Sequence, residues 1–201
     1  MLRRRTGAAA DLLAVGLGNP GAEYERTRHN VGAEVAARLA ARHGSRLKAS
    51  RGSRALSAEV RVGGRLLAVA FPQTYMNDSG MAVASLLRRH GVEDLGRLVV
   101  VHDEMDLPVG RVKVKVGGGT AGHNGLRSIQ AHVHGGAFLR VRIGIGRPPG
   151  REDGVGYVLS APRKAERAEL DVAVEEAADA VEVILAEGGD VAMNRYNPPG
   201  P

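Results

Sequence analysis

The feature that most constrains the fold is a run of four aliphatic residues, Leu98 to Val101, that ends abruptly in acidic groups. Three of the four are β-branched, which is typical of a strand buried on both faces of a sheet. The residues that follow are polar or end the strand: His102, Asp103, Glu104, Asp106, Pro108 and Gly110. Ligands of open α/β sheets bind beyond the carboxyl ends of such strands, so Asp103 is either at a reaction site or in a loop facing water.

Composition excludes several classes of protein. The 201 residues are 43% hydrophobic, which is enough for one well-buried core and predicts one domain rather than two. Cysteine is absent, which excludes disulfides, thiolate nucleophiles and cysteine metal sites, and a reducing cytoplasm is the expected location. The apolar run from Leu12 to Leu17 is too short for a signal peptide or a membrane span, so we expect a soluble protein.

The charge is unevenly distributed along the chain. The formal net charge is +6; residues 1–65 hold 13 Lys/Arg against 5 Asp/Glu, and residues 97–151 hold 9 against 3. Residues 163–187 reverse the balance, with 3 against 8. This polarity predicts a basic working face for a polyanion and an acidic helix elsewhere, while the scarcity of aromatic residues argues against stacking platforms for several bases.

The first third of the chain reads as a strand, a polar loop and a helix. An apolar strand over 11–17 runs into the loop 16–21, which formally matches the dinucleotide-binding fingerprint. No helix follows the glycines directly, as that fold requires, and the next helical periodicity is Val31, Val35 and Leu39. His29 and Asn30 precede this helix, where they either cap it or hold a polar group for chemistry.

The remaining elements follow from residue periodicity. Gly63 and Gly64 form a two-residue hairpin turn, and Gly91 closes a helix whose apolar positions are Met81, Ala84 and Leu87. Strands are expected over 54–62, 65–71, 98–101, 111–116 and 138–145. Helices are expected over 31–44, from a cap at Asn77, Asp78 or Ser79 to Gly91, and over 126–133 and 162–187. The strand 111–116 alternates valine with cations, and in 138–145 Arg140 and Arg142 share one side.

Together these elements predict an α/β protein with a single domain and a mixed, twisted β-sheet flanked by helices. We place the domain at residues 11–196, with a flexible extension over 1–10 and a tail over 197–201. The Gly/Pro-rich stretch 146–156 is expected to be mobile. The glycine-rich stretch 117–125 also matches the dinucleotide fingerprint formally, and residues 122–125 match the GxxG of an RNA-clamping module; a flexible loop before a helix is the plain reading.

The residues available for chemistry favour water activation. There is no Gly-x-Ser-x-Gly elbow, and a metal site is conceivable only from His102, Asp103, Glu104 and Asp106, or from His132 and His134, without an HExxH motif. What remains is a histidine with a carboxylate partner and asparagines on glycine-rich loops. An imidazole can take a proton from water, and asparagine donors suit a developing oxyanion, so these groups suit a hydrolase.

Six blocks together resemble the bacterial-type peptidyl-tRNA hydrolases, in order and at compatible spacing from about residue 12 to about 196. They are residues 16–21, Tyr24 with 27–30, 75–77 with 79–80, 102–104 with 106–108, 117–119 with 122–126, and 140–146. The resemblance implies hydrolysis of the ester between an N-blocked peptide and the 3′ ribose of tRNA. It also implies that the enzyme needs no cofactor and that tRNA and peptide are released for reuse in ribosome-associated quality control. We expect the protein to be a monomer.

The resemblance also assigns roles to residues. His29 matches the general base, Asp103 matches the acid that orients it, and Asn19 matches the residue that distinguishes N-blocked peptides from free aminoacyl groups. Asn77 and Asn124 match side chains that hold the end of the substrate. The full set of substrate-binding positions is Tyr24, Tyr75, Met76, Asn77, His123, Asn124, Lys115 and Arg142, of which the last two lie near the tRNA.

The sequence departs from the family pattern in two places, and three alternative functions stay open. Thr120 and Ala121 interrupt the loop where many relatives carry further glycine or histidine, and residues 1–10 have no counterpart in the family. The alternatives are an RNA-binding relative without turnover, a metal-dependent esterase built on His102, Asp103, Glu104 and Asp106, and a dinucleotide enzyme. The presence of His29, Asp103 and the three asparagines argues against the first.

Overall fold

The computed structural model describes residues 8–148, 150 and 153–198. Its strands are β1 Leu12–Gly16, β2 Lys48–Ser50, β3 Ala55–Val62, β4 Arg65–Pro72, β5 Leu98–Glu104, β6 Val112–Val116 and β7 Leu139–Gly144. Its α-helices are α1 Val31–Arg42, α2 Ser79–His90, α3 Asn124–Val133, α4 Gly154–Val158, α5 Lys164–Glu187 and α6 Gly189–Tyr196. Within the described ranges no helix is both long and apolar enough to cross a membrane.

The strands form one mixed sheet in the order β2-β3-β4-β1-β5-β7-β6. The central strands β4, β1, β5 and β7 are parallel neighbours, whereas the β2–β3, β3–β4 and β6–β7 pairs are antiparallel. Three adjacent parallel strands, β4, β1 and β5, therefore end at the same edge of the sheet. This confirms the expected α/β class, the mixed sheet and the hairpin at Gly63 and Gly64.

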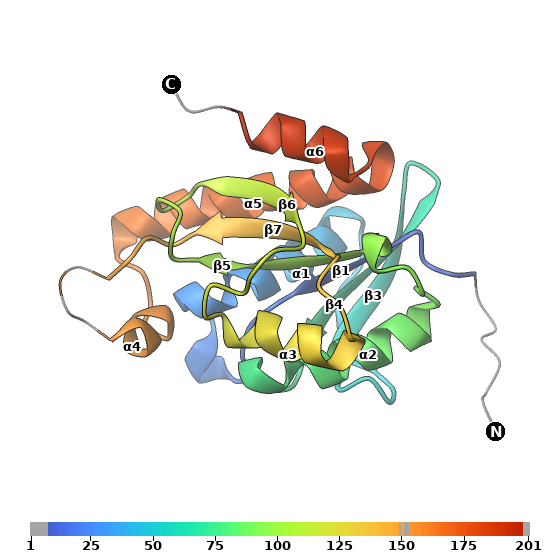
Figure 1. Ribbon diagram of the computed structural model, residues 1–201, viewed down its shortest axis with the longest axis horizontal. Coiled ribbons are helices and arrows are strands. Elements are labelled where there is room, and N and C mark those ends of the chain that lie inside the picture. The colour runs from blue at the N-terminus through green and yellow to red at the C-terminus, as the bar shows by residue number, and fades with distance from the viewer. Residues whose placement is uncertain (1–7, 149, 151–152, 199–201) are drawn as a thin grey trace.

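Helices cover both faces of the sheet (Figure 1). On one face α1, α5 and α6 pack with the odd-numbered residues of β5, Val99 and Val101; on the other, α2 and α3 pack with Leu98 and Val100. All four side chains are buried, as the β-branched run predicts. Alternation along β5 therefore turns the side chain of Asp103 toward the α1 face and that of His102 toward the α2–α3 face.

Two glycines let α1 lie directly on the sheet. A Cβ on Gly32 would come within 2.2 Å of the Val101 carbonyl oxygen, and one on Gly16 within 2.0 Å of the Gly32 carbonyl oxygen. The backbone of α1 thus contacts β1 and β5 with no side chain between them. This close approach fixes the first turn of α1, and the residues just before it, beside the end of β5.

The acidic helix α5 lies against α1 and the turns before it, although the charge pattern predicted that it lies away from the basic segments. Acids of α5 pair with arginines of α1 and the turns before it, in contacts such as Arg42–Glu175, Arg42–Asp179 and Arg26–Asp171. Four of the cations in the first third of the chain, Arg26, Arg28, Arg38 and Arg42, are thus paired with acids of α5. Lys113 and Lys115 of β6 and Arg142 of β7 form a separate basic cluster beside the end of β5.

Several expectations need correction. β2, α4 and α6 were not anticipated because the segments are short. The buried apolar positions of α2 are Ala82, Val83 and Leu86. Of the predicted stripe, Leu87 packs partly buried against the core and Ala84 is half-buried, but Met81 is exposed, so its assignment was wrong. The described residues leave out parts of three predicted segments. These parts are residues 1–7 of the extension, 149 and 151–152 of the mobile stretch, and 199–201 of the tail.

Asn197, which the predicted boundary places in the tail, bonds to the edge of the sheet. Its side chain accepts a hydrogen bond from the Val114 amide at 3.0 Å and donates one to the Val114 carbonyl at 2.6 Å. These two bonds satisfy backbone groups on the edge strand β6.

Candidate active site

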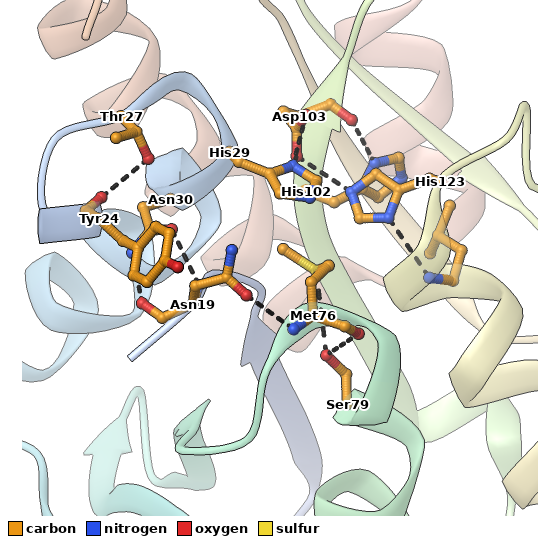
Figure 2. A network of polar contacts seen from close by, with 11 residues as sticks. Asn19, Tyr24, Thr27, His29, Asn30, Met76, Ser79, His102, Asp103 and His123 are labelled. Carbon is orange, nitrogen blue, oxygen red and sulfur yellow. Dashed lines mark hydrogen bonds and ion pairs between the residues drawn. The ribbon is translucent and has the colours of Figure 1, made fainter. Parts of the chain in front are cut away.

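The site centres on a histidine and an aspartate that are 74 residues apart in the chain. His29 lies in a 3-10 turn, Arg28–Asn30, that leads into α1, and Asp103 is the penultimate residue of β5. The Nδ1 atom of His29 is 2.9 Å from Oδ1 and 3.0 Å from Oδ2 of Asp103 (Figure 2). The histidine predicted from the loop and the carboxylate predicted from the strand are thus in direct contact.

Asp103 also accepts a hydrogen bond from a second imidazole. The Nε2 atom of His123 is 3.0 Å from Oδ1 of Asp103, and its Nδ1 atom accepts a hydrogen bond from the Leu126 amide at 3.4 Å (Figure 2). Because Nδ1 accepts, the proton of a neutral His123 ring is on Nε2 and is donated to Asp103. His123 therefore caps the N-terminus of α3 and binds the carboxylate at the same time.

The environment sets the protonation of this cluster. Burial alone would raise the pKa of the Asp103 carboxyl, but His29 and His123 hold it well below its usual range, so it is ionised. Burial alone would lower the pKa of His29, and the charge and hydrogen bond of Asp103 outweigh this and raise it. An ionised carboxylate accepts the Nδ1 proton of His29, which leaves the lone pair of a neutral ring on Nε2.

The same three side chains are spaced as metal ligands could be. One ligand atom from each of His29, Asp103 and His123 lies within 4.8 Å of the others. A metal would bind the nitrogens that donate protons to Asp103, so both rings would have to change tautomer. The Leu126 amide opposes this change in His123, since a protonated Nδ1 would face an N–H donor. The geometry favours a hydrogen-bonded cluster.

The metal sites considered from the sequence do not assemble in this way. His102 and Glu104 point to the opposite side of β5 from Asp103, and Asp106 pairs with Arg147. His132 binds the Ser128 carbonyl in its own helix, and His134 is the C-terminal cap residue of α3.

Asn19 is held with its amide in a defined orientation. The side chain of Asn30 bonds to both backbone groups of Asn19, to the amide through Oδ1 and to the carbonyl through Nδ2, each at 2.9 Å. The Oδ1 atom of Asn19 accepts a hydrogen bond from the Met76 amide at 2.7 Å (Figure 2). The NH2 group of Asn19 is therefore left to donate, which is the polarity an oxyanion requires.

A pocket of about 400 Å³ opens over this cluster. Most of the predicted site residues line it: Asn19, His29, Tyr75, Met76, Asn77, Asp103, His123 and Asn124. Tyr24 does not; it packs edge-on against Tyr75, with ring centroids 6.4 Å apart. Apolar side chains of Met105, Val155, Val158 and Leu159 complete the wall. Most of the predicted set is thus brought into one cavity, whose wall contains both polar and apolar groups.

Lys115 and Arg142 lie on β6 and β7 and are not among the residues that line the pocket. They form a basic cluster with Lys113, the cross-strand neighbour of Arg142, whereas Arg140, the cross-strand neighbour of Lys115, is buried and is not part of it. Burial and the neighbouring Arg142 and Arg140 lower the pKa of Lys115. This excess of positive charge suits a polyanion.

Three polar residues have roles in the site that the sequence did not predict. Asn30 was interpreted as a possible helix cap, but its side chain makes no cap bond and binds Asn19 instead. Arg140 was placed on a cationic face, but it is buried and donates to the carbonyls of Gly118 and Gly119, which fixes the glycine-rich loop. His102 is buried and packs edge-on against His123; burial, with a smaller effect of His123, lowers the pKa of His102 to about 3.

The Asn30 clamp, which is the pair of hydrogen bonds between the Asn30 side chain and the Asn19 backbone, can be tested by replacing the NH2 group of Asn30 with an oxygen atom. Asn30→Asp keeps an acceptor for the Asn19 amide but sets a carboxylate oxygen against the Asn19 carbonyl. We expect the free energy of unfolding in urea to fall by about 1–3 kcal/mol. Activity should fall further than this instability explains, because the Asn19 amide loses its orientation. The matched change Asn194→Asp on the exposed face of α6 should alter neither; equal effects of the two variants would contradict the clamp.

Comparisons with known proteins show what the chain is similar to. The family model described as peptidyl-tRNA hydrolase matches residues 13–200. A peptidyl-tRNA hydrolase of Rhodococcus erythropolis is 51% identical over 185 residues, covering 92% of this chain and 97% of that protein. One from Mycobacterium tuberculosis H37Rv is 50% identical over 189 residues, covering 94% and 98% respectively.

A solved structure shows the same fold. The crystal structure of peptidyl-tRNA hydrolase from Acinetobacter baumannii superposes with a TM-score of 0.87 at 36% identity, covering 96% of this chain and 97% of that one. The match therefore includes the whole sheet and the helices on both of its faces. On the evidence of the family model, the relatives and this structure, the chain belongs to the peptidyl-tRNA hydrolase family.

Proposed function

We propose that the chain hydrolyses the ester bond of peptidyl-tRNA with His29 as the general base that activates water. Membership of the family gives the activity: hydrolysis of peptidyl-tRNA, which releases the tRNA. The observation that carries the mechanism is the contact between Nδ1 of His29 and the buried carboxylate of Asp103. This contact leaves Nε2 as the group that can accept a proton in the pocket.

Water is the nucleophile in this scheme. His29 removes a proton from a water molecule through Nε2 as the oxygen attacks the ester carbonyl, and Asp103 stabilises the imidazolium that forms. The imidazolium then returns a proton to the ribose oxygen as the ester bond breaks. An ester suits this arrangement better than an amide, since an alkoxide departs more easily than an amine anion.

Three amides are available to the substrate around His29. The NH2 group of Asn19 is directed by the Met76 amide, whereas Asn77 and Asn124 are exposed in the pocket wall. We assign Asn19 to the developing oxyanion and Asn77 and Asn124 to the end of the substrate. Tyr75 and Met76 provide an apolar surface for the peptide, and Tyr24 supports Tyr75 from behind. In this scheme His123 orients Asp103 through a hydrogen bond to Oδ1, the oxygen that His29 also contacts.

The tRNA is assigned to the basic cluster on β6 and β7. The Nη1 atom of Arg142 lies 4.0 Å from Oε2 of Glu104, a residue that lines the pocket, so the cluster is adjacent to the pocket. Its cations would contact phosphates of the acceptor stem, which carry no sequence information. We further propose that the protein acts as a monomer in the cytoplasm, because all the groups invoked come from one chain and the substrate is made by ribosomes.

The function is tested with N-acetyl-aminoacyl-tRNA, by measuring release of the N-blocked amino acid with and without a chelator. His29→Ala should lose about 10²- to 10⁴-fold in turnover and keep most of its affinity for tRNA. The wild-type rate should not respond to the chelator. A His29→Ala rate close to that of the wild type would remove His29 from the mechanism, and chelator-sensitive turnover would favour a metal-dependent esterase.

The pH dependence has a defined sign. The base form of His29 is present above its pKa, which Asp103 raises above the usual value of about 6.5. The value of kcat/KM should therefore fall as the pH drops through a pKa higher than 6.5. Asp103→Asn removes the raising effect and leaves burial, so the apparent pKa should move down while the plateau drops about 10²- to 10⁴-fold. An unchanged apparent pKa would show that Asp103 is not the partner of the titrating group.

The basic cluster predicts salt-dependent binding. Lys115→Gln and Arg142→Gln should each weaken tRNA binding and reduce the slope of log Kd against log salt by about one. Arg88→Gln is the matched control, since Arg88 is in the last turn of α2, the end farther from the pocket. Fluorescence anisotropy with labelled tRNA measures all three. Binding that salt does not affect would place the tRNA elsewhere.

A further inference from the structure

The residue before the proposed base has a side chain that points away from the pocket. Arg28 is 5% exposed, and its Nη1 group lies within hydrogen-bonding distance of the carbonyls of Tyr157, Ser160 and Ala161, at 3.3–3.4 Å, and of Ser160 Oγ at 2.6 Å. Its Nη2 group binds Glu166 at 2.7 Å, and its guanidinium lies 4.2 Å from the centroid of the Tyr157 ring.

These contacts gather the C-terminal end of α4 and the first turn of α5 around one guanidinium. The backbone amide of Arg28 also donates to the Ser160 carbonyl, at 3.2 Å. The Tyr157 hydroxyl donates to the Ile145 carbonyl at 2.6 Å, which ties the same segment to the end of β7. α4 otherwise stands apart from the other helices at one side of the molecule (Figure 1). Arg28 therefore ties α4 to the turn that carries His29.

The opposite side of this segment forms an apolar wall of the pocket. The wall consists of Val155, Val158 and Leu159. Val155 is 60% exposed and Leu159 is 37% exposed, and both face the cavity that Tyr75 also lines. Large apolar side chains left this open at a pocket rim are suited to an apolar ligand group. In peptidyl-tRNA the groups of that kind nearest the ester are the side chains of the last residues of the peptide.

We propose that Arg28 is a positioning residue that holds the α4 wall over the pocket and thereby sets how tightly apolar peptide side chains bind. The proposal rests on the proposed function of the same site. Arg28 touches neither the pocket nor the base, so it acts through Val155, Val158 and Leu159. Because Arg28 and His29 share one 3-10 turn, the wall and the base are fixed from the same point of the backbone.

The test compares two substrates that differ only in the apolar side chain, N-acetyl-leucyl-tRNA and N-acetyl-glycyl-tRNA. Arg28→Gln should raise KM for the leucyl substrate about tenfold, and for the glycyl substrate less than about twofold, with kcat nearly unchanged. Arg28→Lys retains the charge and reaches fewer of the acceptors, so its KM should lie between. The apparent pKa of the kcat/KM profile should not move, because the His29–Asp103 pair is untouched.

A double-mutant cycle shows whether Arg28 acts through the wall. Leu159→Ala should produce the same substrate-selective rise in KM, and adding Arg28→Gln to it should raise KM less than about twofold further. Arg26→Gln is the matched control, since Arg26 is in the same loop and pairs with Asp171 at the surface; it should change neither KM. If Arg28→Gln does not fold, Arg28→Lys takes its place in the cycle.

Several results would overturn the proposal. Equal rises in KM for both substrates would mean that Arg28 affects tRNA binding or general stability. A fall in kcat with a shifted pH profile would mean that it acts on His29. Fully additive effects of Arg28→Gln and Leu159→Ala would mean that it does not act through the wall. Failure of the proposed function is distinguishable, because the wild-type protein would then hydrolyse neither substrate.

Discussion

The interaction on which the rest of the site depends is the acceptance of two imidazole N–H donors by one buried carboxylate. Asp103 is 4% exposed, and an ionised carboxylate at that depth is tolerated only when its oxygens are hydrogen-bonded. His29 and His123 supply those bonds. The carboxylate in turn fixes the tautomer of each ring, so the orientation of His29, the proposed base, and the stability of the buried charge have the same cause.

The topology of the sheet brings the other groups to this carboxylate. β4, β1 and β5 are adjacent and parallel; Met76 and Asn19 lie in the segments that follow β4 and β1, and Asp103 lies at the end of β5 itself. The contact between Asn19 and Met76 joins two of these segments. His29 and His123 come from the turns that begin α1 and α3, one on each face of the sheet. The site is thus the crevice at the carboxyl ends of parallel strands, where such folds bind ligands.

Much of the fold was predictable because its signals are local. The run from Leu98 to Val101 marked a strand buried on both faces, and the glycine pair 63–64 marked a hairpin. Short segments such as β2, α4 and α6 carry too few residues for a period to be recognised. Met81 was assigned to the buried stripe of α2 from spacing alone, but the packing against α3 selects the neighbouring positions.

The site was predictable from the sequence only in part. Spacing indicated that Asp103 ends a strand and that His29 precedes a helix, but not that the two meet; that expectation came from the resemblance to a family. Asn30 and Arg140 bond to backbone groups of distant segments, and no local pattern distinguishes such a side chain from a cap or a surface cation. Residues that hold a site together through long-range bonds require coordinates.

The most direct measurement of the central claim is the position of the ring protons. Long-range ¹H–¹⁵N correlation of the ¹⁵N-histidine-labelled protein, at a pH above the pKa of His29, reports which nitrogen of each imidazole is protonated. We predict a proton on Nδ1 of His29 with an unprotonated Nε2, and the reverse arrangement in His123. A proton on Nε2 of His29 would contradict it, because the nitrogen assigned to accept a proton from water would already carry one.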